Sequence, residues 1–204
     1  MSSTFLHPYS LPGHNDVINV HELRQILTGL KNNMAVGIVG IPSEVYQFTS
    51  ELLLSMMSIF ISCCMLTSKL PRTHMHLVII LLLKCKSKDP ADVNNYRTIA
   101  ISTALSKVLE QVLLALLARY LWTADSQFGF KQAHGTEMAI FALRQTVDFY
   151  LNHDAHVYMC FLEAKKAFDR VNHWTIANKL LNRKVPLHIV KLFIFWYREQ
   201  GFMV

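Results

Sequence analysis

The chain has 204 residues, of which 52% are hydrophobic and 17% charged. This apolar content excludes a disordered tail, because the chain can bury enough apolar surface to offset the entropy lost on folding. The formal net charge is +6, and all of it comes from residues 84–204, which hold 16 Lys or Arg and 10 Asp or Glu. A basic region beside a neutral one is typical of proteins that handle nucleic acid, although on composition alone ordinary surface charge explains it equally well.

The predicted elements of the first half are mostly helices. Apolar residues three and four apart predict an amphipathic helix over residues 20–30. After a Gly-rich turn at 36–40, Pro42 opens a second helix. The predicted buried side chains of that helix are Val45, Phe48, Leu52, Met56, Ile59 and Cys63. The continuous apolar run 76–83 predicts a strand, and the basic segment 84–90 predicts a turn.

Two capped helices are predicted in the middle of the chain. Ser102 is placed to cap a helix whose inner face runs to Tyr120. A loop over residues 125–135 follows. Thr136 is then placed to cap a helix that runs to Tyr150.

A buried strand is predicted near the C-terminal quarter. The unbroken apolar run Val157–Leu162 is typical of a strand buried on both faces, and it ends at Glu163. Residues 167–184 are predicted to be helical, and Pro186 opens the last helix. Together these elements predict a helix-rich α+β fold.

The four cysteines show neither a CxxC spacing nor a Cys/His zinc pattern. They are therefore predicted to be reduced, buried, intracellular thiols. The N-terminus lacks the basic-then-apolar layout of a signal peptide. The most apolar segment, Leu52–Leu66, falls short of the roughly 20 residues that a membrane-spanning helix needs. A small membrane protein built on this segment and on Leu77–Leu83 is therefore the less favoured alternative, and no membrane partner is expected.

The stretch with the clearest chemical character follows the predicted buried strand. Glu163 ends the strand, and Phe168 and Asp169 come five and six residues later. The carboxyl ends of buried strands are where α/β folds present functional groups. Taken alone, an acid in this position is more often a turn residue or a helix cap.

Four motifs together resemble the reverse transcriptases of LINE-like, non-LTR retrotransposons. Residues 162–171 resemble the family's motif A, Leu-Asp-x-x-Lys-Ala-Phe-Asp-x-Val. Residues 95–99 resemble Asn-Tyr-Arg-Pro-Ile, and residues 127–131 resemble Gln-x-Gly-Phe-(Arg/Lys). Residues 31–44 resemble Lys-Ala-x-Gly-x-Asp-Gly-Ile-Pro. The motifs occur in the family's order and spacing, and they cover roughly residues 20–204.

The resemblance implies a role for individual residues. Glu163 takes the place of the motif A aspartate that binds both catalytic Mg²⁺ ions, and the backbone carbonyl of Ala164 would be a second ligand. Phe168 falls at the steric gate that excludes a ribose 2′-OH; plain core packing is its alternative. Arg97 and Lys131 would meet the incoming triphosphate and the template backbone.

Further implied contacts are with nucleic acid. Lys84, Lys86 and Lys88 would bind template phosphates without reading sequence; a merely solvated turn is the alternative. Asp169 is interpreted as structural. The implied partners are an RNA template, a DNA primer and deoxynucleoside triphosphates.

The resemblance also implies a domain organisation. Residues 1–70 would be a helical extension before the fingers, residues 71–155 the fingers, and residues 156–204 the start of the palm of a right-hand polymerase. The missing parts of the palm and the thumb would belong to a longer chain. An intracellular location is expected, without a choice between nucleus and cytoplasm.

The sequence departs from the family pattern at several positions. Glu163 replaces Asp, Val39 stands where an acid is usual, and Thr98 replaces Pro. No Tyr-x-Asp-Asp run occurs in the 204 residues. The chain alone is therefore predicted to be inactive as a polymerase. Two alternatives follow: a segment of a longer enzyme, or a non-catalytic relic that binds nucleic acid through its basic half.

Overall fold

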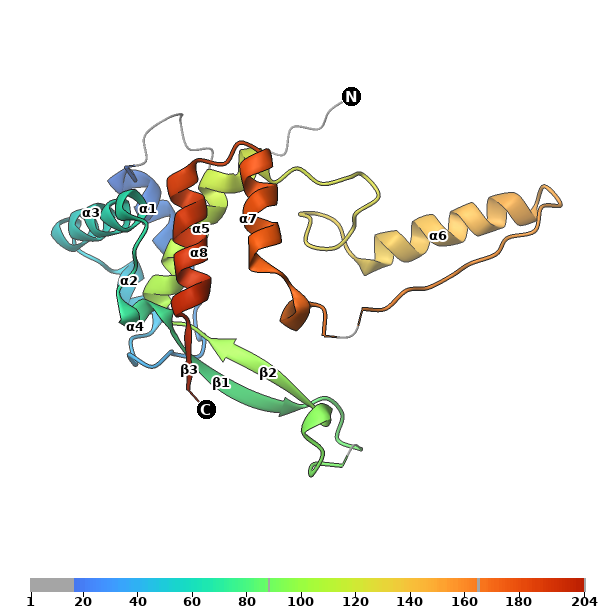
Figure 1. Ribbon diagram of the computed structural model, residues 1–204, viewed down its shortest axis with the longest axis horizontal. Coiled ribbons are helices and arrows are strands. Elements are labelled where there is room, and N and C mark those ends of the chain that lie inside the picture. Colours follow the sequence, from blue (N-terminus) through green and yellow to red (C-terminus); the bar gives the residue numbers. More distant parts are fainter. Residues whose placement is uncertain (1–16, 88, 165, 204) are drawn as a thin grey trace. The chain divides into compact units, whose positions relative to one another are not determined.

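The structure, a computed structural model, describes residues 17–87, 89–164 and 166–203 (Figure 1). Its helices are α1 (Val20–Thr28), α2 (Ser43–Gln47), α3 (Glu51–Thr67), α4 (Arg72–Met75), α5 (Ala104–Leu117), α6 (Thr136–Leu151), α7 (His173–Asn182) and α8 (Leu187–Glu199). Its strands are β1 (His76–Leu83), β2 (Tyr96–Ile101) and β3 (Gly201–Met203), and 3-10 turns cover Val93–Asn95, Ala118–Tyr120 and Phe168–Arg170. Helices with a small mixed sheet confirm the predicted helix-rich α+β class.

The chain divides into two compact units. Unit 1 contains the described residues up to Tyr120 together with those from His173 onward, and unit 2 contains Leu121–Asn172. Segments far apart in the sequence therefore build one body, because α7, α8 and β3 return to the helices and strands of the first 120 residues.

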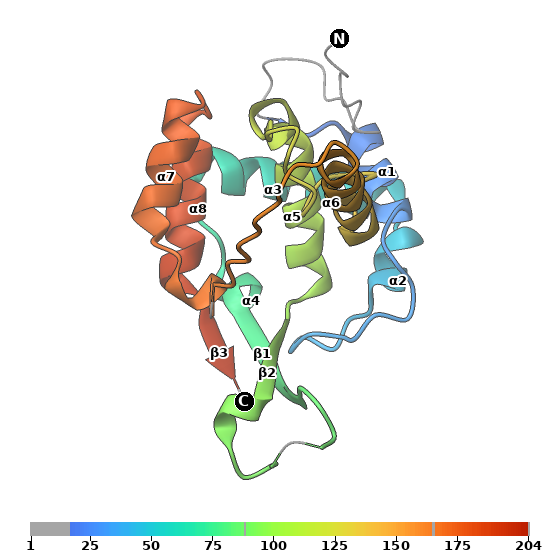
Figure 2. The ribbon, with the colours of Figure 1, turned by 90° about the vertical axis from the view of Figure 1, so that its right-hand side faces the viewer.

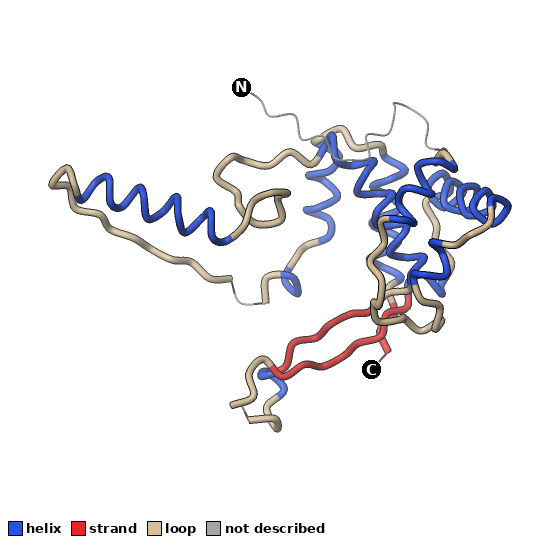
Figure 3. Tube along the Cα trace, turned by 180° about the vertical axis from the view of Figure 1, so that it is seen from behind, coloured by secondary structure: helices blue, strands red, loops and turns tan. Residues whose placement is uncertain are grey.

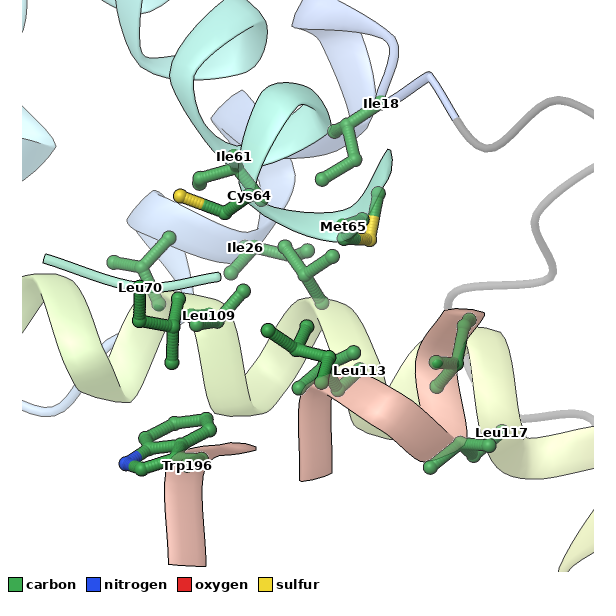
Figure 4. Close-up of a cluster of buried hydrophobic side chains, with 14 of the residues drawn as sticks. Ile18, Ile26, Ile61, Cys64, Met65, Leu70, Leu109, Leu113, Leu117 and Trp196 are labelled. Carbon is green, nitrogen blue, oxygen red and sulfur yellow. The ribbon is translucent and has the colours of Figure 1, made fainter. Parts of the chain in front are cut away.

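The core of unit 1 lies among α1, α3, α5 and α8, which pack against one another (Figure 4). Its fully buried large side chains are Leu23, Leu27, Leu54, Ile61, Met65, Val108, Val112, Leu113, Val190 and Leu192. Removing such a side chain from water stabilises the fold by about 1.5–3 kcal/mol each. These residues come from four helices, so the C-terminal helix α8 belongs to this core as fully as α1, α3 and α5 do.

Two buried serines connect α1 to α3. The Ile18 backbone N–H donates to Ser62 Oγ over 3.0 Å, and Ser58 Oγ donates to the Ile18 carbonyl. A buried hydroxyl costs little when it is hydrogen-bonded in this way. Asn19 then caps α1, its side chain accepting from the His21 N–H over 2.9 Å.

The predicted second helix differs from the observed one in extent and in orientation. The chain breaks after α2, and Ser50 caps a separate helix, α3, by accepting from the Leu53 N–H. The six side chains predicted to be buried are all exposed: Val45, Phe48, Leu52, Met56, Ile59 and Cys63. The buried stripe of α3 contains instead Leu54, Ile61 and Met65. The prediction is wrong because α3 is apolar on nearly all sides, so that packing partners and not periodicity select its buried face.

The cap of α5 is Thr103 and not the predicted Ser102. Thr103 Oγ1 accepts from the Ser106 N–H over 3.2 Å. Ser106 Oγ in turn donates to the His74 carbonyl over 2.7 Å, which ties the start of α5 to α4. The prediction that Thr136 caps the next helix is also wrong, because the N-cap of α6 is Gly135, which has no side chain to bond, and Thr136 is the first residue of the helix.

The sheet of unit 1 has the strand order β2-β1-β3 (Figure 3). Strand β1 confirms the predicted strand at 76–83 and pairs antiparallel with β2, with Leu82 opposite Arg97. The short β3 pairs parallel with the start of β1. Figures 1 and 2 show the β1–β2 hairpin reaching away from the helices of unit 1.

Unit 2 contains α6 and two irregular segments around it. No residue of α6 is buried. The predicted strand Val157–Leu162 is not formed: residues 155–164 lie outside regular structure. A strand requires a neighbour for its N–H and C=O groups, and among the described residues only β1, β2 and β3 form a sheet. The predicted helix over 167–184 is divided into the 3-10 turn Phe168–Arg170 and α7.

The prediction that the cysteines are buried is wrong for three of the four. Cys64 is buried, whereas Cys63, Cys85 and Cys160 are exposed. Burial, together with the neighbouring Cys63, raises the pKa of the Cys64 thiol to about 11. Within the described part of the chain, no helix combines the length and apolar content needed to cross a membrane.

Candidate functional site

The loop of the β1–β2 hairpin is organised by its own side chains. The Tyr96 hydroxyl donates to the Pro90 carbonyl over 2.9 Å, and Asn95 Nδ2 donates to the Asp89 carbonyl over 2.9 Å. Asp89 Oδ1 and Asp92 Oδ1 accept backbone N–H groups two residues downstream, each over 2.9 Å. The first two residues of the Asn-Tyr-Arg motif therefore hold the loop, and the two loop acids are engaged with its backbone.

The described cations of the hairpin are exposed, and two of them bond to no described acid of the loop. Lys84 Nζ donates to the Asn94 carbonyl over 2.7 Å, so that this side chain also closes the end of the hairpin. Lys86 is exposed in the loop, and Arg97 is exposed on β2. Lys88 lies outside the described residues. The hairpin thus presents at least three positive side chains to solvent at its far end.

The segment at residues 31–44, which carries the N-terminal motif, packs against the start of α5. A Cβ on Gly37 would lie 2.7 Å from the Ser102 carbonyl oxygen, so that only glycine fits there without movement. Lys107 Nζ donates to the Ala35 carbonyl over 3.3 Å. Val39, which replaces the family's acid, helps to line a pocket of about 170 Å³ together with His74. Gly37 therefore allows this segment to pack closely against the residues just before α5.

Lys131 of the Gln-Phe-Gly-Phe-Lys motif lies within a loop that folds on itself in unit 2. Its Nζ is 3.4 Å from the Ala124 carbonyl and 4.0 Å from the Asp125 carboxylate. Only 8% of the Lys131 side chain is exposed. Gln127 Nε2 also bonds within the loop, to the Gly129 carbonyl over 3.0 Å. The nearly buried Lys131 side chain therefore stabilises the fold of this loop through its contacts with Ala124 and Asp125.

Two motifs meet at a pair of aromatic rings. Phe130 and Phe168 have ring centroids 6.2 Å apart at 84°, an edge-to-face arrangement. Phe130 is 94% exposed and Phe168 is 78% exposed. Plain core packing of Phe168 is therefore wrong for this structure. Phe130 belongs to a recognised motif, but nothing in the sequence pattern assigned it a contact with Phe168.

Glu163 and Ala164 are exposed and lie in the irregular segment that precedes Phe168. The Asp169 side chain lies outside the described residues. Among those described, no three His, Cys, Asp or Glu side chains gather where they could hold a metal ion. One carboxylate and one carbonyl supply only two of the roughly six oxygen ligands that Mg²⁺ requires. These residues do not by themselves fit a magnesium site.

A family profile described as "Reverse transcriptase (RNA-dependent DNA polymerase)" matches residues 85–203, which is more than half of the chain. The chain belongs to this reverse transcriptase family. The matched range includes the hairpin loop, the Gln-Phe-Gly-Phe-Lys loop and the Phe130–Phe168 pair. The family resemblance inferred from the four motifs is therefore confirmed.

Two curated relatives are RNA-directed DNA polymerases of mobile elements. The chain is 26% identical over 196 residues to the RNA-directed DNA polymerase from mobile element jockey of Drosophila funebris, covering 93% of this chain and 21% of the relative. It is 23% identical over 173 residues to the jockey polymerase of Drosophila melanogaster, covering 81% of this chain and 18% of the relative. The chain thus spans about a fifth of the length of these relatives. It is a reverse transcriptase domain segment of the retrotransposon type.

Proposed function

We propose that this chain is the part of an RNA-directed DNA polymerase that positions nucleic acid through the basic end of its β1–β2 hairpin. The hairpin structure carries the proposal, because its acids bond to the loop backbone while Lys86 and Arg97 face solvent. The hydrogen bonds of Asn95 and Tyr96 hold the loop backbone, so less backbone freedom is lost when its cations meet phosphates. Phosphate contacts of this kind position a nucleic acid without reading its sequence.

The fingers, on this proposal, extend over residues 71–155 and the palm begins at residue 156, after a helical extension over residues 1–70. Arg97 and Lys131 would then meet the triphosphate or template backbone. For Lys131 this requires its ammonium to leave the Ala124 carbonyl and the Asp125 carboxylate. Phe168 would pack on the nucleotide sugar, and its exposed ring beside Phe130 is consistent with that role.

We further infer that the 204-residue polypeptide does not synthesise DNA by itself. Glu163 is longer than the family's aspartate by one methylene, which moves the carboxylate by about 1 Å; an error of that size can cost on the order of 10²-fold in rate. The sequence also holds no Tyr-x-Asp-Asp run to contribute further carboxylates. Phosphoryl transfer is largely a matter of positioning and charge neutralisation, so either change is severe.

Salt-dependent binding tests the hairpin. Binding of a labelled RNA to the wild-type chain should weaken steeply with salt, and changing Lys84, Lys86 and Lys88 to Ala should lower the slope of log K against log salt by roughly 2 to 3. The matched control changes three cations of the neutral N-terminal region, Lys31, Lys69 and Arg72, to Ala. Equal slopes for the two triple variants would show that the hairpin cations are solvated surface.

Primer extension on an RNA template with Mg²⁺ tests the inferred inactivity. Neither the chain nor its Glu163→Asp variant should extend a primer. In a chimaera that adds a family-type Tyr-x-Asp-Asp segment, Glu163→Asp should raise the rate by about 10²-fold. Extension by the 204-residue chain itself would refute the inference, and an unchanged rate in the chimaera would refute the part that concerns Glu163.

A further inference from the structure

The last two helices of unit 1 form an unusually basic stretch. Residues 171–198 contain five Lys or Arg and no Asp or Glu, although the whole chain has 14 acidic residues. Two histidines lie in the same stretch. This segment is separate in sequence from the hairpin, and none of the implied family contacts was assigned to it.

The structure gathers most of these cations around the turn between α7 and α8. Lys179 lies one turn before the end of α7, and Lys191 lies one turn after the start of α8. Lys184 is in the turn itself, and all three are exposed. Arg183 Nη1 donates to the Tyr120 carbonyl over 3.2 Å, which brings the end of α5, with the exposed Arg119, to the same place. We call this set the α7–α8 basic end: Arg119, Lys179, Arg183, Lys184 and Lys191.

This surface lies away from the hairpin within unit 1. Figures 1 and 2 show the α7–α8 turn at one end of the helices and the β1–β2 hairpin extending from the other end. The Arg183–Tyr120 bond agrees with this arrangement, because Tyr120 lies beyond the end of α5 while Thr103, at the start of α5, adjoins β2. The two basic surfaces are therefore distinct.

Helix physics accounts for only part of the basic end. The helix dipole favours cations near the C-terminus of α7, and this effect explains the positions of Lys179 and Arg183. The first turn of a helix instead favours acids, yet α8 has none there and carries Lys191 in its second turn. Among the described residues, Lys179, Lys184 and Lys191 take part in none of the ion pairs, which involve Arg24, Lys131, Arg144 and Arg198. Unpaired like charges repel one another, and a polyanion would relieve that repulsion.

We propose that the α7–α8 basic end is a second nucleic-acid-binding surface, which contacts the phosphate backbone without reading sequence. The proposal rests on the proposed function, since nucleic acid is the polyanion that this family handles. Lysine is a point-charge phosphate binder, and the exposed Asn182 beside Lys179 and Arg183 adds an amide donor of the type that contacts phosphate and sugar. The α7–α8 basic end would thus bind either another part of the nucleic acid that the hairpin binds or a second strand.

The test compares three charge-matched triple variants of the full chain. The first changes Lys179 and Lys191 to Gln and Lys184 to Asn, because Lys184 has φ +65° and Asn tolerates that conformation. The second changes the three hairpin lysines to Gln. The control changes Lys31, Lys69 and Arg72 to Gln. Each is titrated with a labelled 20-nucleotide single-stranded RNA between 25 and 200 mM KCl, after circular dichroism has shown wild-type helix content.

The α7–α8 variant should bind at least about tenfold more weakly at low salt, with the slope of log K against log salt lowered by about 2. Combining it with the hairpin variant should add the two slope changes, and replacing the same lysines with Arg should keep binding. If the α7–α8 variant matches the control while the hairpin variant does not, the second surface is wrong and the proposed function stands. If both match the control, the proposed function fails as well. Tighter lysine-dependent binding to phosphatidylserine vesicles than to RNA would overturn the choice of nucleic acid.

Discussion

Replacing Leu54 by Ala tests which face of α3 is buried. Leu54 is 0% exposed in the core of unit 1, whereas Leu52 on the same helix is 73% exposed. Removing a fully buried leucine costs about 2–5 kcal/mol, because the lost transfer free energy is joined by the cost of the cavity. The same change at an exposed site costs about 0.5 kcal/mol or less.

The expected difference is large enough for thermal unfolding followed by far-UV circular dichroism. For a domain of this size, 1 kcal/mol shifts Tm by about 2–4 °C, so a loss of about 3 kcal/mol lowers Tm by about 6–12 °C. Leu54→Ala should show that shift, and Leu52→Ala should lie within about 2 °C of the wild type. A larger shift for Leu52→Ala than for Leu54→Ala would mean that the face predicted from periodicity is the buried one and that Leu54 does not lie in the core.

Three further changes test the hydrogen bonds and close contacts that shape unit 1. Burial lowers the pKa of His74 from its usual 6.5, and its Nε2 has no hydrogen-bond partner. The unfolded chain therefore takes up a proton first, and stability should fall below about pH 6.5 by up to about 1.4 kcal/mol per pH unit; urea unfolding of His74→Gln should show a shallower fall. Tyr96→Phe removes the bond to the Pro90 carbonyl and should cost about 1 kcal/mol while speeding amide hydrogen exchange in the hairpin loop; unchanged exchange would show that this bond does not hold the loop. Gly37→Ala should cost about 1–3 kcal/mol by overpacking, whereas Gly129→Ala, with open space around its Cβ, should cost little; equal losses in unfolding free energy would contradict the close packing at Gly37.

Local signals predicted those elements whose formation depends on neighbouring residues in the sequence. The apolar run at 76–83 became β1 with the predicted bounds, and Pro186 precedes α8 as predicted. The family motifs are likewise short and ordered along the chain, so that their recognition required no fold. The hairpin cations Lys86 and Arg97 could be named from the sequence, but only the structure shows that both side chains are exposed and that Asp89 and Asp92 bond to the loop backbone.

Other features depended on contacts between distant segments. Val157–Leu162 has the composition of a strand, but a strand forms only where another strand accepts its hydrogen bonds. The Phe130–Phe168 contact joins residues 38 positions apart, and no spacing rule connects them. The acid-free stretch at 171–198 was visible in the sequence, whereas its gathering with Arg119 required the bond from Arg183 to the Tyr120 carbonyl.

The sequence by itself determined the family, the helix-rich class and the positions of most elements, because apolar period, proline and motif order are local properties. Only the tertiary structure decided which side of each element is used. Ser102 and Thr103 are both favoured N-cap types, with Ser the stronger, yet Thr103 became the cap, where Ser106 bonds to the His74 carbonyl. Helix α3 is apolar on nearly every side, and the side that faces α1 and α8 became its buried face.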